Sequence, residues 1–427
     1  MAETLNLGNG DWATKENSLL GYNSENGNYK PLPFDFTRAS SATVVNKSGL
    51  IETAANGVPR IDFLGNTSGA LLLEPQSTNI LTNSENGSTY TVFSATKTLD
   101  EVISPDGTLN SFTLEGNGDY NQVLGETVSV TLPNAGDYTF SVFAKKGTNN
   151  FIQLFFNQFS GSSNGEAYFD LENGTTPSSF GKIENYGNGW YRCSVIGTVI
   201  GSDLNGKFGF RISYNSSNFF FPTANDANGK NAYFYGFQIE QSSYPTSYLK
   251  TEGSAVTRNG DQVNGAGDAA TFNDSEGVLM AEISALANDL TYRQISLTEA
   301  GGGGDVLTLD LSSVSNGVRT YLKVNGTPSI LNATLSNETD FNKIAVKYGN
   351  THELWINGFE VSSQSLTLLP ITLNRLNFDN GVGGGNFYGN TSQVQYFNTA
   401  LTDSELEKLT SWASFIEMAQ AQNYNII

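Results

Sequence analysis

Apolar and polar residues alternate along most of the chain after residue 80, with a period of two that is typical of β-strands. In GDYTFSVFAKKG, Tyr138, Phe140 and Val142 fall on one face and the intervening residues on the other. Further runs follow at short intervals between Gly, Asn and Asp turns: NFIQLFFNQ, EAYFDLENG, GNGWYRCSVIGTV, GKFGFRISY and NAYFYGFQIEQ. Closely spaced strands without a helical period between them predict a jelly-roll β-sandwich over residues 81–258.

A second β-rich region, residues 259–427, begins with the polar, Gly-rich stretch GDQVNGAGDAATFNDSEG, which has the composition of a linker. VKYGNTHELWINGFEV predicts hairpins, with Asn357-Gly358 as a two-residue turn. Near the end, LTDSELEKLTSWASFIEMAQ has Thr402 or Asp403 as a cap and apolar residues at helical spacing. The sequence therefore predicts an all-β protein whose second β-sandwich carries one short C-terminal helix.

Residues 1–80 lack a clear period, and prolines such as Pro31 and Pro33 argue against regular strands or helices. The segment is nevertheless rich in apolar residues. We therefore expect an irregular attachment or oligomerisation segment that is buried between copies of the chain in a closed oligomer or against another protein. The apolar residues expected to make these contacts are Trp12, Leu19, Leu20, Phe34 and Phe36.

Composition and charge narrow the possible partners. The 427 residues carry a net charge of −20, so nucleic acid and anionic membrane surfaces are unfavourable partners. No run approaches the ~18 apolar residues of a membrane helix, and the N-terminus lacks the basic and apolar regions of a signal peptide. We expect a protein made in a cytoplasm that reaches the outside by lysis. Cys193, in the strand-like WYRCSV, is expected to be an inert core thiol.

Four pieces stand in order between Phe36 and Asn79: FTRASSAT, GLIE, VPRIDF and LLLEPQSTN. This segment resembles the N-terminal segment of many tailed-phage virion proteins. Residues 81–258, through SPDGT, YTFSVFAKKGT, IENYGNGWYRCSV and YFYGFQIEQSSYPTSYLKTEGSAVTR, resemble the carbohydrate-binding jelly roll of that group. Residues 259–427 are similar to concanavalin A-like, laminin-G-like lectin domains, through IAVKYGNTHELWINGFEV and NFYGNTSQVQYFNTALTDSELEKLT.

The resemblance implies a structural protein of the virion, of the head-fibre, head-decoration or tail-fibre type. Its implied partners are other capsid or tail proteins, further copies of itself in a homotrimer, and glycans of the host surface or of mucus. The alternative is a purely structural decoration protein that binds no glycan. A polysaccharide depolymerase is the third possibility.

The sequence contains little that could support catalysis. Glycosidases need paired carboxylates, and the nearest match to an E-x-D-x-x-E strand is ETDFNK, which begins at Glu338, includes Asp340 and ends in lysine. His352 is the one histidine and is expected at the surface of a hairpin. No nucleophile-elbow, Walker or zinc-protease motif occurs. We therefore expect a protein that is not an enzyme and requires no cofactor.

Sugar binding needs aromatic faces beside polar hydrogen-bonding groups. The loop NSSNFFFPTAND is the strongest candidate in the first sandwich, and Trp190 is expected in the core instead. The candidate glycan-binding residues are Tyr214, Phe219 and Phe220, with Trp355 and Tyr388 in the second sandwich. The resemblance to the jelly roll also implies a structural calcium ion, for which the matching positions are Asn83, Glu85 and Glu240.

Overall fold

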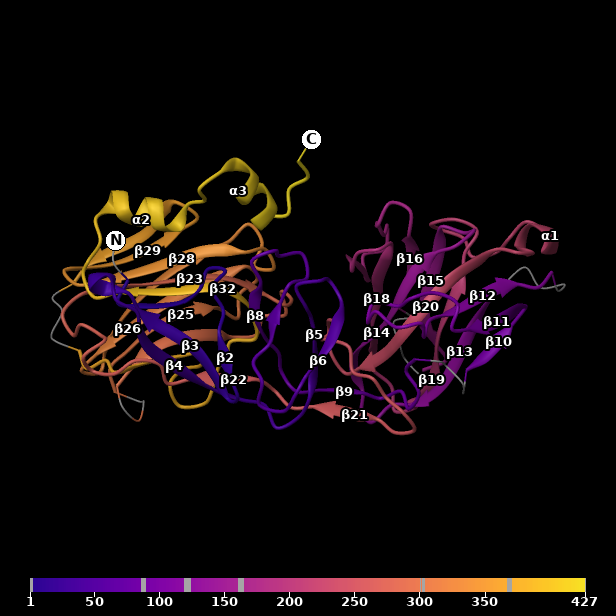
Figure 1. Ribbon diagram of the computed structural model, residues 1–427, viewed down its shortest axis with the longest axis horizontal. Coiled ribbons are helices and arrows are strands. Elements are labelled where there is room, and N and C mark those ends of the chain that lie inside the picture. The colour runs from indigo at the N-terminus through magenta and orange to yellow at the C-terminus, as the bar shows by residue number, and fades with distance from the viewer. Residues whose placement is uncertain are drawn as a thin grey trace. The chain divides into compact units, whose positions relative to one another are not determined.

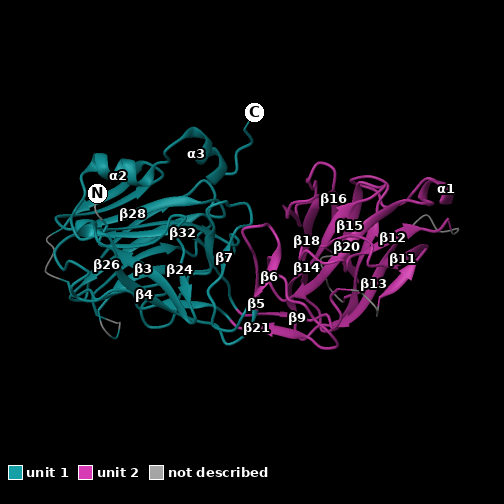
Figure 2. Cartoon of the chain, in the orientation of Figure 1, with its two compact units in different colours: residues 1–41, 54–75, 260–427 teal, residues 42–53, 76–259 magenta. Residues whose placement is uncertain are grey.

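The computed structural model describes residues 3–85, 90–118, 124–159, 165–299, 301, 304–366 and 371–426 (Figure 1). Over this part of the chain the named strands pair antiparallel and the helices are short, so the predicted all-β class is confirmed. The helical elements are the 3₁₀ turn η1 (Glu25–Gly27), α1 (Ala224–Ala227), α2 (Asp403–Thr410) and α3 (Phe415–Ala421). The chain divides into two compact units (Figure 2). Unit 1 is residues 1–41, 54–75 and 260–427, and unit 2 is residues 42–53 and 76–259.

Unit 1 contains two antiparallel sheets, which we call the large sheet and the small sheet. The large sheet runs in the order β22 (Gln262–Asn264), β4 (Lys30–Thr37), β3 (Ser18–Asn23), β1 (Leu5–Gly8), β32 (Gly389–Phe397), β23 (Gly277–Ala285), β28 (Asn342–Tyr348), β29 (Thr351–Ile356) and β30 (Phe359–Ser365). Shorter strands join it at β2 (Thr14–Lys15), β7 (Ile61–Asp62) and β8 (Ala70–Leu73). The small sheet runs in the order β27 (Thr327–Thr334), β26 (Gly317–Val324), β25 (Val306–Leu311), β24 (Arg293–Thr298) and β31 (Arg375–Asn377).

The core of unit 1 lies between these two sheets. Leu279 and Ile344 of the large sheet share one buried cluster with Leu307 and Leu309 of the small sheet. The large sheet also buries part of its other face, because α2 packs on β28, β29 and β30 (Figure 1). A second cluster that includes Leu406 of α2 fills this contact. The helix is capped as predicted, with Thr402 preceding its first turn.

The expectation that residues 1–80 are irregular was wrong, because much of this segment forms strands that complete the core of unit 1. Strand β1 lies between β3 and β32, with Leu5 opposite Tyr396. Leu19, Phe34 and Phe36 are buried in this core, so they are not exposed on the chain for contact with another protein. Of the other two predicted contact residues, Trp12 is partly buried against the same core and Leu20 is exposed.

The prolines of β4 did not prevent strand formation, for a reason that sequence alone does not show. Pro31 and Pro33 pair with β3 on one side, opposite Tyr22 and Leu20. On the other side, among the described residues, β22 pairs with β4 only from Asp35 onward. The proline-bearing half of β4 therefore lies at an edge of the sheet, where a missing N–H donor breaks no ladder.

The charged residues of the N-terminal motif meet inside unit 1 in what we call the buried ion network. Arg38 pairs with one oxygen of Asp261 at 3.0 Å, and Arg60 pairs with its other oxygen. Arg60 also pairs with Glu74 at 2.6 Å, and the Glu74 N–H donates to Asp261 at 2.8 Å. Burial lowers the pKa of Arg60, but the two carboxylates more than offset this, so the net pKa is raised. The turn-rich motif thus positions charges that neutralise one another in a core.

Unit 2 is a second sandwich, whose sheets we call the front sheet and the back sheet. The front sheet runs in the order β10 (Thr91–Phe93), β13 (Leu124–Thr131), β19 (Asn205–Ile212), β15 (Phe151–Asn157) and β16 (Glu166–Asp170). The back sheet runs in the order β11 (Ala95–Leu99), β12 (Phe112–Gly116), β20 (Asn231–Glu240), β14 (Gly136–Lys146), β18 (Trp190–Val199) and β17 (Gly181–Asn185). Two two-stranded sheets complete the unit. One pairs β9 (Ser77–Asn79) with β21 (Val256–Arg258), and the other pairs β5 (Ala42–Val45) with β6 (Ile51–Ala54).

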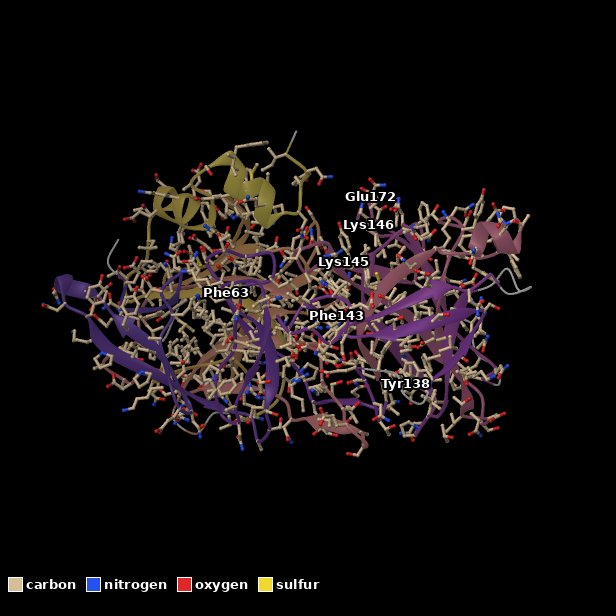
Figure 3. All side chains as sticks on the ribbon, turned by 45° about the vertical axis from the view of Figure 1, so that its right-hand side comes forward. Phe63, Tyr138, Phe143, Lys145, Lys146 and Glu172 are labelled. Carbon is tan, nitrogen blue, oxygen red and sulfur yellow. The ribbon has the colours of Figure 1, made fainter. Side chains whose placement is uncertain are left out.

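The back sheet is buried on both faces. Tyr138 of β14 belongs to the buried cluster between the sheets, whereas Phe143, further along the same strand, lies outside that cluster and packs against Tyr235 and Tyr248. Both residues are labelled in Figure 3. Trp190 and Cys193 are buried, as the sequence predicted. Burial raises the pKa of the Cys193 thiol, which keeps it protonated and unreactive.

Candidate functional site

The outward face of the front sheet carries polar and aromatic side chains in register. Residues of β19 such as Phe208 and Phe210 point into the core, so the alternate residues of each strand point away from it. Strand pairing aligns two rows across this outward face. The first row is Phe93, Gly125, Arg211, Gln153 and Tyr168, and the second is Thr91, Thr127, Gly209, Phe155 and Glu166.

Two glycines within these rows allow aromatic rings to lie close to the sheet. A Cβ atom at Gly125 would lie 2.8 Å from Cζ of Phe93, and one at Gly209 would lie 2.6 Å from Cζ of Phe155. Both distances are shorter than ordinary carbon contacts, so any larger residue would displace the ring. A glycine inside a strand often marks such a close approach.

Arg211 lies at the centre of this face and contacts two aromatic rings. Its guanidinium carbon is 3.9 Å from the ring centroid of Phe155 and 4.1 Å from that of Phe219. Its Nη1 donates to Oε1 of Gln153 at 3.1 Å, and Nε2 of Gln153 donates to Glu166 at 3.0 Å. Burial lowers the pKa of Arg211, yet the group stays charged at neutral pH because an arginine starts from above 12.

The loop between β19 and α1 brings the predicted aromatic residues to two neighbouring places. Phe219 covers Arg211 and contacts Phe220, with ring centroids 4.3 Å apart. Tyr214 contacts Phe221 instead, at 5.9 Å, and both line an open pocket of about 380 Å³. The remaining lining residues of the pocket are polar: Asn149, Asn225, Asp226, Asn228 and Lys230. The three residues predicted in this loop therefore lie at the sheet face and at the pocket beside it.

The two candidates predicted in the second sandwich do not form one surface. Trp355 is buried in the cluster beneath α2, and its indole N–H donates to Glu353 at 3.1 Å. Tyr388 packs against the other cluster of unit 1, between the large and small sheets. The expectation that Trp355 offers a face to a sugar was wrong, because the helix covers the strand face that the alternation pattern left open.

The predicted calcium residues have protein partners in this structure. The buried carboxylate of Glu240 accepts hydrogen bonds from Ser77, Gln238 and Thr246 at 2.6–2.9 Å. Glu85 accepts from Lys250 at 2.9 Å. Asn83 bridges by its backbone to Glu252. Across the described ranges, no group of three or more His, Cys, Asp and Glu side chains could hold a metal ion.

The sequence candidates for catalysis belong to unit 1, whereas Arg211 belongs to unit 2. His352 is fully buried, so its predicted surface position was wrong. Its two ring nitrogens lie 3.1 Å from the hydroxyl of Thr320 and 2.6 Å from that of Ser329. Glu338 is also buried, and Asp340 accepts a hydrogen bond from Asn423 near α3.

In the part of the chain that the structure describes, no helix is both long and apolar enough to cross a membrane.

Sequence reasoning missed the sheet-face residues Arg211, Gln153, Phe155, Tyr168 and Glu166. Their strands were recognised, but the face that points outward depends on which residues enter the core. One available signal was glycine inside two strands, in LGETVSVT and GKFGFRIS, because interior glycines mark close approach.

The chain matches no known protein-family model, and no curated protein sequence is significantly similar to it. Among solved structures, it is similar to the CBM40 of the Ruminococcus gnavus IT-sialidase, at 16% identity over 35% of this chain and 94% of that chain, with a TM-score of 0.30. Domain 4 of a GH43 extracellular arabinanase from Geobacillus stearothermophilus, in complex with arabinotriose, matches at 11% identity over 36% and 73%, with a TM-score of 0.30.

A pentraxin from Limulus polyphemus matches at 12% identity over 33% of this chain and 71% of that chain, with a TM-score of 0.27. The structures similar to parts of this chain thus include a carbohydrate-binding module and a domain solved with an oligosaccharide. At these TM-scores the likenesses carry no argument about the function of this chain.

Proposed function

We propose that the protein is a non-enzymatic carbohydrate-binding protein whose binding surface is the outward face of the front sheet together with the adjoining pocket. The observation that carries the proposal is a group of partly exposed polar and aromatic side chains on this face: Arg211, Tyr168 and Phe219. The buried Gln153 and Phe155 contact Arg211 from beneath and hold it in place. Sugars pack on aromatic faces and exchange hydrogen bonds with such polar groups. Tyr214 and Phe220 at its margin are about half exposed, so their rings are open to a ligand.

The test is a glycan array probed with the full chain, followed by titration of the best ligand. Phe220→Ala and Tyr214→Ala are each expected to weaken binding about fivefold, because one aromatic contact contributes roughly 1 kcal/mol. Phe359→Ala is the matched control, because Phe359 is an exposed phenylalanine on β30 of unit 1. Failure to bind any glycan, even when the protein is multimerised on beads, would favour the purely structural alternative.

We propose further that the protein is a virion appendage of the head-fibre, decoration or tail-fibre type. Support comes from the resemblance of residues 36–79 to phage virion proteins. Immunogold labelling of purified virions tests the location. Light scattering of the full chain tests the homotrimer, which predicts three times the chain mass of 46.0 kDa.

A further inference from the structure

We infer that Arg211 is a receptor for a carboxylate, and that the glycan bound at the front sheet is therefore an acidic one. This inference rests on the proposed function, since it names the class of sugar that the same surface selects. It starts from a charge that the protein leaves unneutralised.

The guanidinium of Arg211 has more donors than the described residues use. Of its five N–H groups, one has an acceptor in the described part of the chain, namely Oε1 of Gln153. Nε is buried and lacks an acceptor among those residues. The nearest carboxylate by its electrostatic effect, Glu166, is held by Gln153 and forms no ion pair with Arg211. Leaving donors of a charged group unpaired is unfavourable, and an anionic ligand would satisfy those on Nη1 and Nη2, which unlike Nε are not among the buried unpaired atoms.

Unit 1 contains a second arginine on a sheet face beside aromatic rings, Arg319, and a carboxylate of the protein neutralises its charge. Arg319 lies on the outward face of the small sheet, 5.0 Å from the ring centroid of Tyr292 and 5.6 Å from that of Tyr321. Its Nε and Nη2 both contact the buried carboxylate of Asp310, at 2.8 and 2.6 Å. The protein supplies the carboxylate at Arg319. At Arg211 the corresponding acceptor is the neutral amide of Gln153.

The geometry at Arg211 favours a planar anion of one negative charge. Contacts with Phe155 and Phe219 hold the guanidinium, so its free donors are displayed in one plane. Donors in a fixed plane match the two oxygens of a carboxylate. A phosphate would bring a second negative charge close to Glu166, on a protein whose net charge is already −20.

The test uses full-length protein and two pairs of probes in which methyl esterification removes the carboxylate charge: oligogalacturonate against its methyl ester, and sialyllactose against its methyl ester. Binding of at least one acid is expected to exceed that of its ester by tenfold or more. Arg211→Gln should abolish the difference. Arg211→Lys should retain part of it, because lysine keeps the positive charge but lacks the planar set of paired N–H donors of the guanidinium. Lys182→Gln, which removes an exposed charge from β17 of the back sheet, should leave the preference intact.

The outcomes separate this inference from the proposed function. Equal binding of acid and ester, still weakened by Phe220→Ala, would keep glycan binding and overturn the carboxylate receptor. Binding of neither member of either pair, with neutral glycans bound on the array, would overturn it too. No binding of any glycan would remove both. Thermal unfolding of each variant shows whether a loss reflects the site or the fold, and Arg211→Lys supplies a second, milder substitution.

Discussion

At the scale of single residues, His352 shows how an apparently exposed position became part of the core. It lies on β29 of the large sheet, and its ring nitrogens reach Thr320 and Ser329 of the small sheet. Gln364 on β30 donates to the same Ser329 hydroxyl at 2.7 Å. The imidazole therefore links two sheets in its neutral form, and burial lowers its pKa to about 4.

We predict that this histidine makes unit 1 sensitive to mild acid. The pKa in the folded state lies below the value of 6.5 in the unfolded state, so the unfolded state binds the proton more readily. Stability is therefore unaffected above about pH 6.5, falls as the pH drops, and has lost up to about 3 kcal/mol by pH 4. Urea unfolding between pH 5 and 7.5, compared with His352→Asn, isolates this slope from carboxylate titration. The same slope in both proteins would contradict the prediction.

The buried ion network supplies a second prediction at this scale. Asp261→Asn removes the carboxylate that Arg38 and Arg60 share. Both buried guanidinium groups then lose a negatively charged partner. Breaking a buried ion pair from one side destabilises a protein by about 3–5 kcal/mol. The matched control is Lys146→Gln, at the exposed pair of Lys146 with Glu172 (Figure 3), where an effect of at most about 1 kcal/mol is expected. Equal shifts in urea midpoint would refute the difference.

At the scale of elements, the N-terminal strands determine whether unit 1 can form. Strands β1, β3, β4 and β8 contribute side chains to one cluster with strands that begin after residue 276. The short strand β1 fills the space between β3 and β32, so its removal would open the large sheet in its middle. The N-terminal strands are therefore part of the fold of unit 1 and cannot be removed without disrupting it.

We predict that the truncated chain 81–427 loses the fold of unit 1. The truncation removes Leu5, Leu7, Leu19, Phe34 and Phe36 from the core. Burial of each such side chain contributes about 1.5–3 kcal/mol, so the five together contribute about 7–15 kcal/mol, as much as the whole stability of most domains. Limited proteolysis should degrade residues 260–427 while a fragment of unit 2 survives. Protection of both parts, with an unchanged near-ultraviolet dichroism spectrum per tryptophan, would show that the N-terminal strands are dispensable.

At the scale of the whole molecule, the chain passes between the two units at residues 41–42, 53–54, 75–76 and 259–260. Unit 1 is therefore assembled from three separate segments. Unit 2 is simpler, because its hydrophobic core is drawn from residues 81–239 of a continuous stretch. A single continuous fragment of the chain can therefore contain the core of unit 2, whereas no fragment shorter than nearly the whole chain contains that of unit 1.

We predict that the fragment 76–259 folds alone and that 260–427 does not. The first retains the whole described core of unit 2 and loses β5 and β6, together with the hydrogen bond from Thr43 to the Tyr248 carbonyl oxygen. The second lacks the N-terminal strands of the large sheet. Cooperative thermal unfolding, followed by circular dichroism, is expected for the first fragment and absent for the second. A cooperative transition in 260–427 would contradict this.

The sequence predicted features that depend on near neighbours in the chain. Alternation identified the long strands of unit 2, and the capping pattern located the start of α2 beside Thr402. Short strands such as β1 were missed, because four residues hold too little of a period to recognise. Its partner, β32, follows almost 390 residues later. For the site, the loop with Tyr214 and Phe219 was found through composition, whereas the sheet face around Arg211 was not.

What the sequence determined by itself was the all-β class and the positions of turns. The Asn357-Gly358 turn, for example, has positive φ angles of 51° and 91°, which asparagine and glycine adopt more readily than other residues. Such preferences act within a few residues. The tertiary structure alone decided that α2 covers Trp355, that His352 lies between two sheets, and that Arg211 faces outward without a carboxylate partner. Each of these depends on which distant segments pack together, and a local pattern of apolar and polar residues does not specify that.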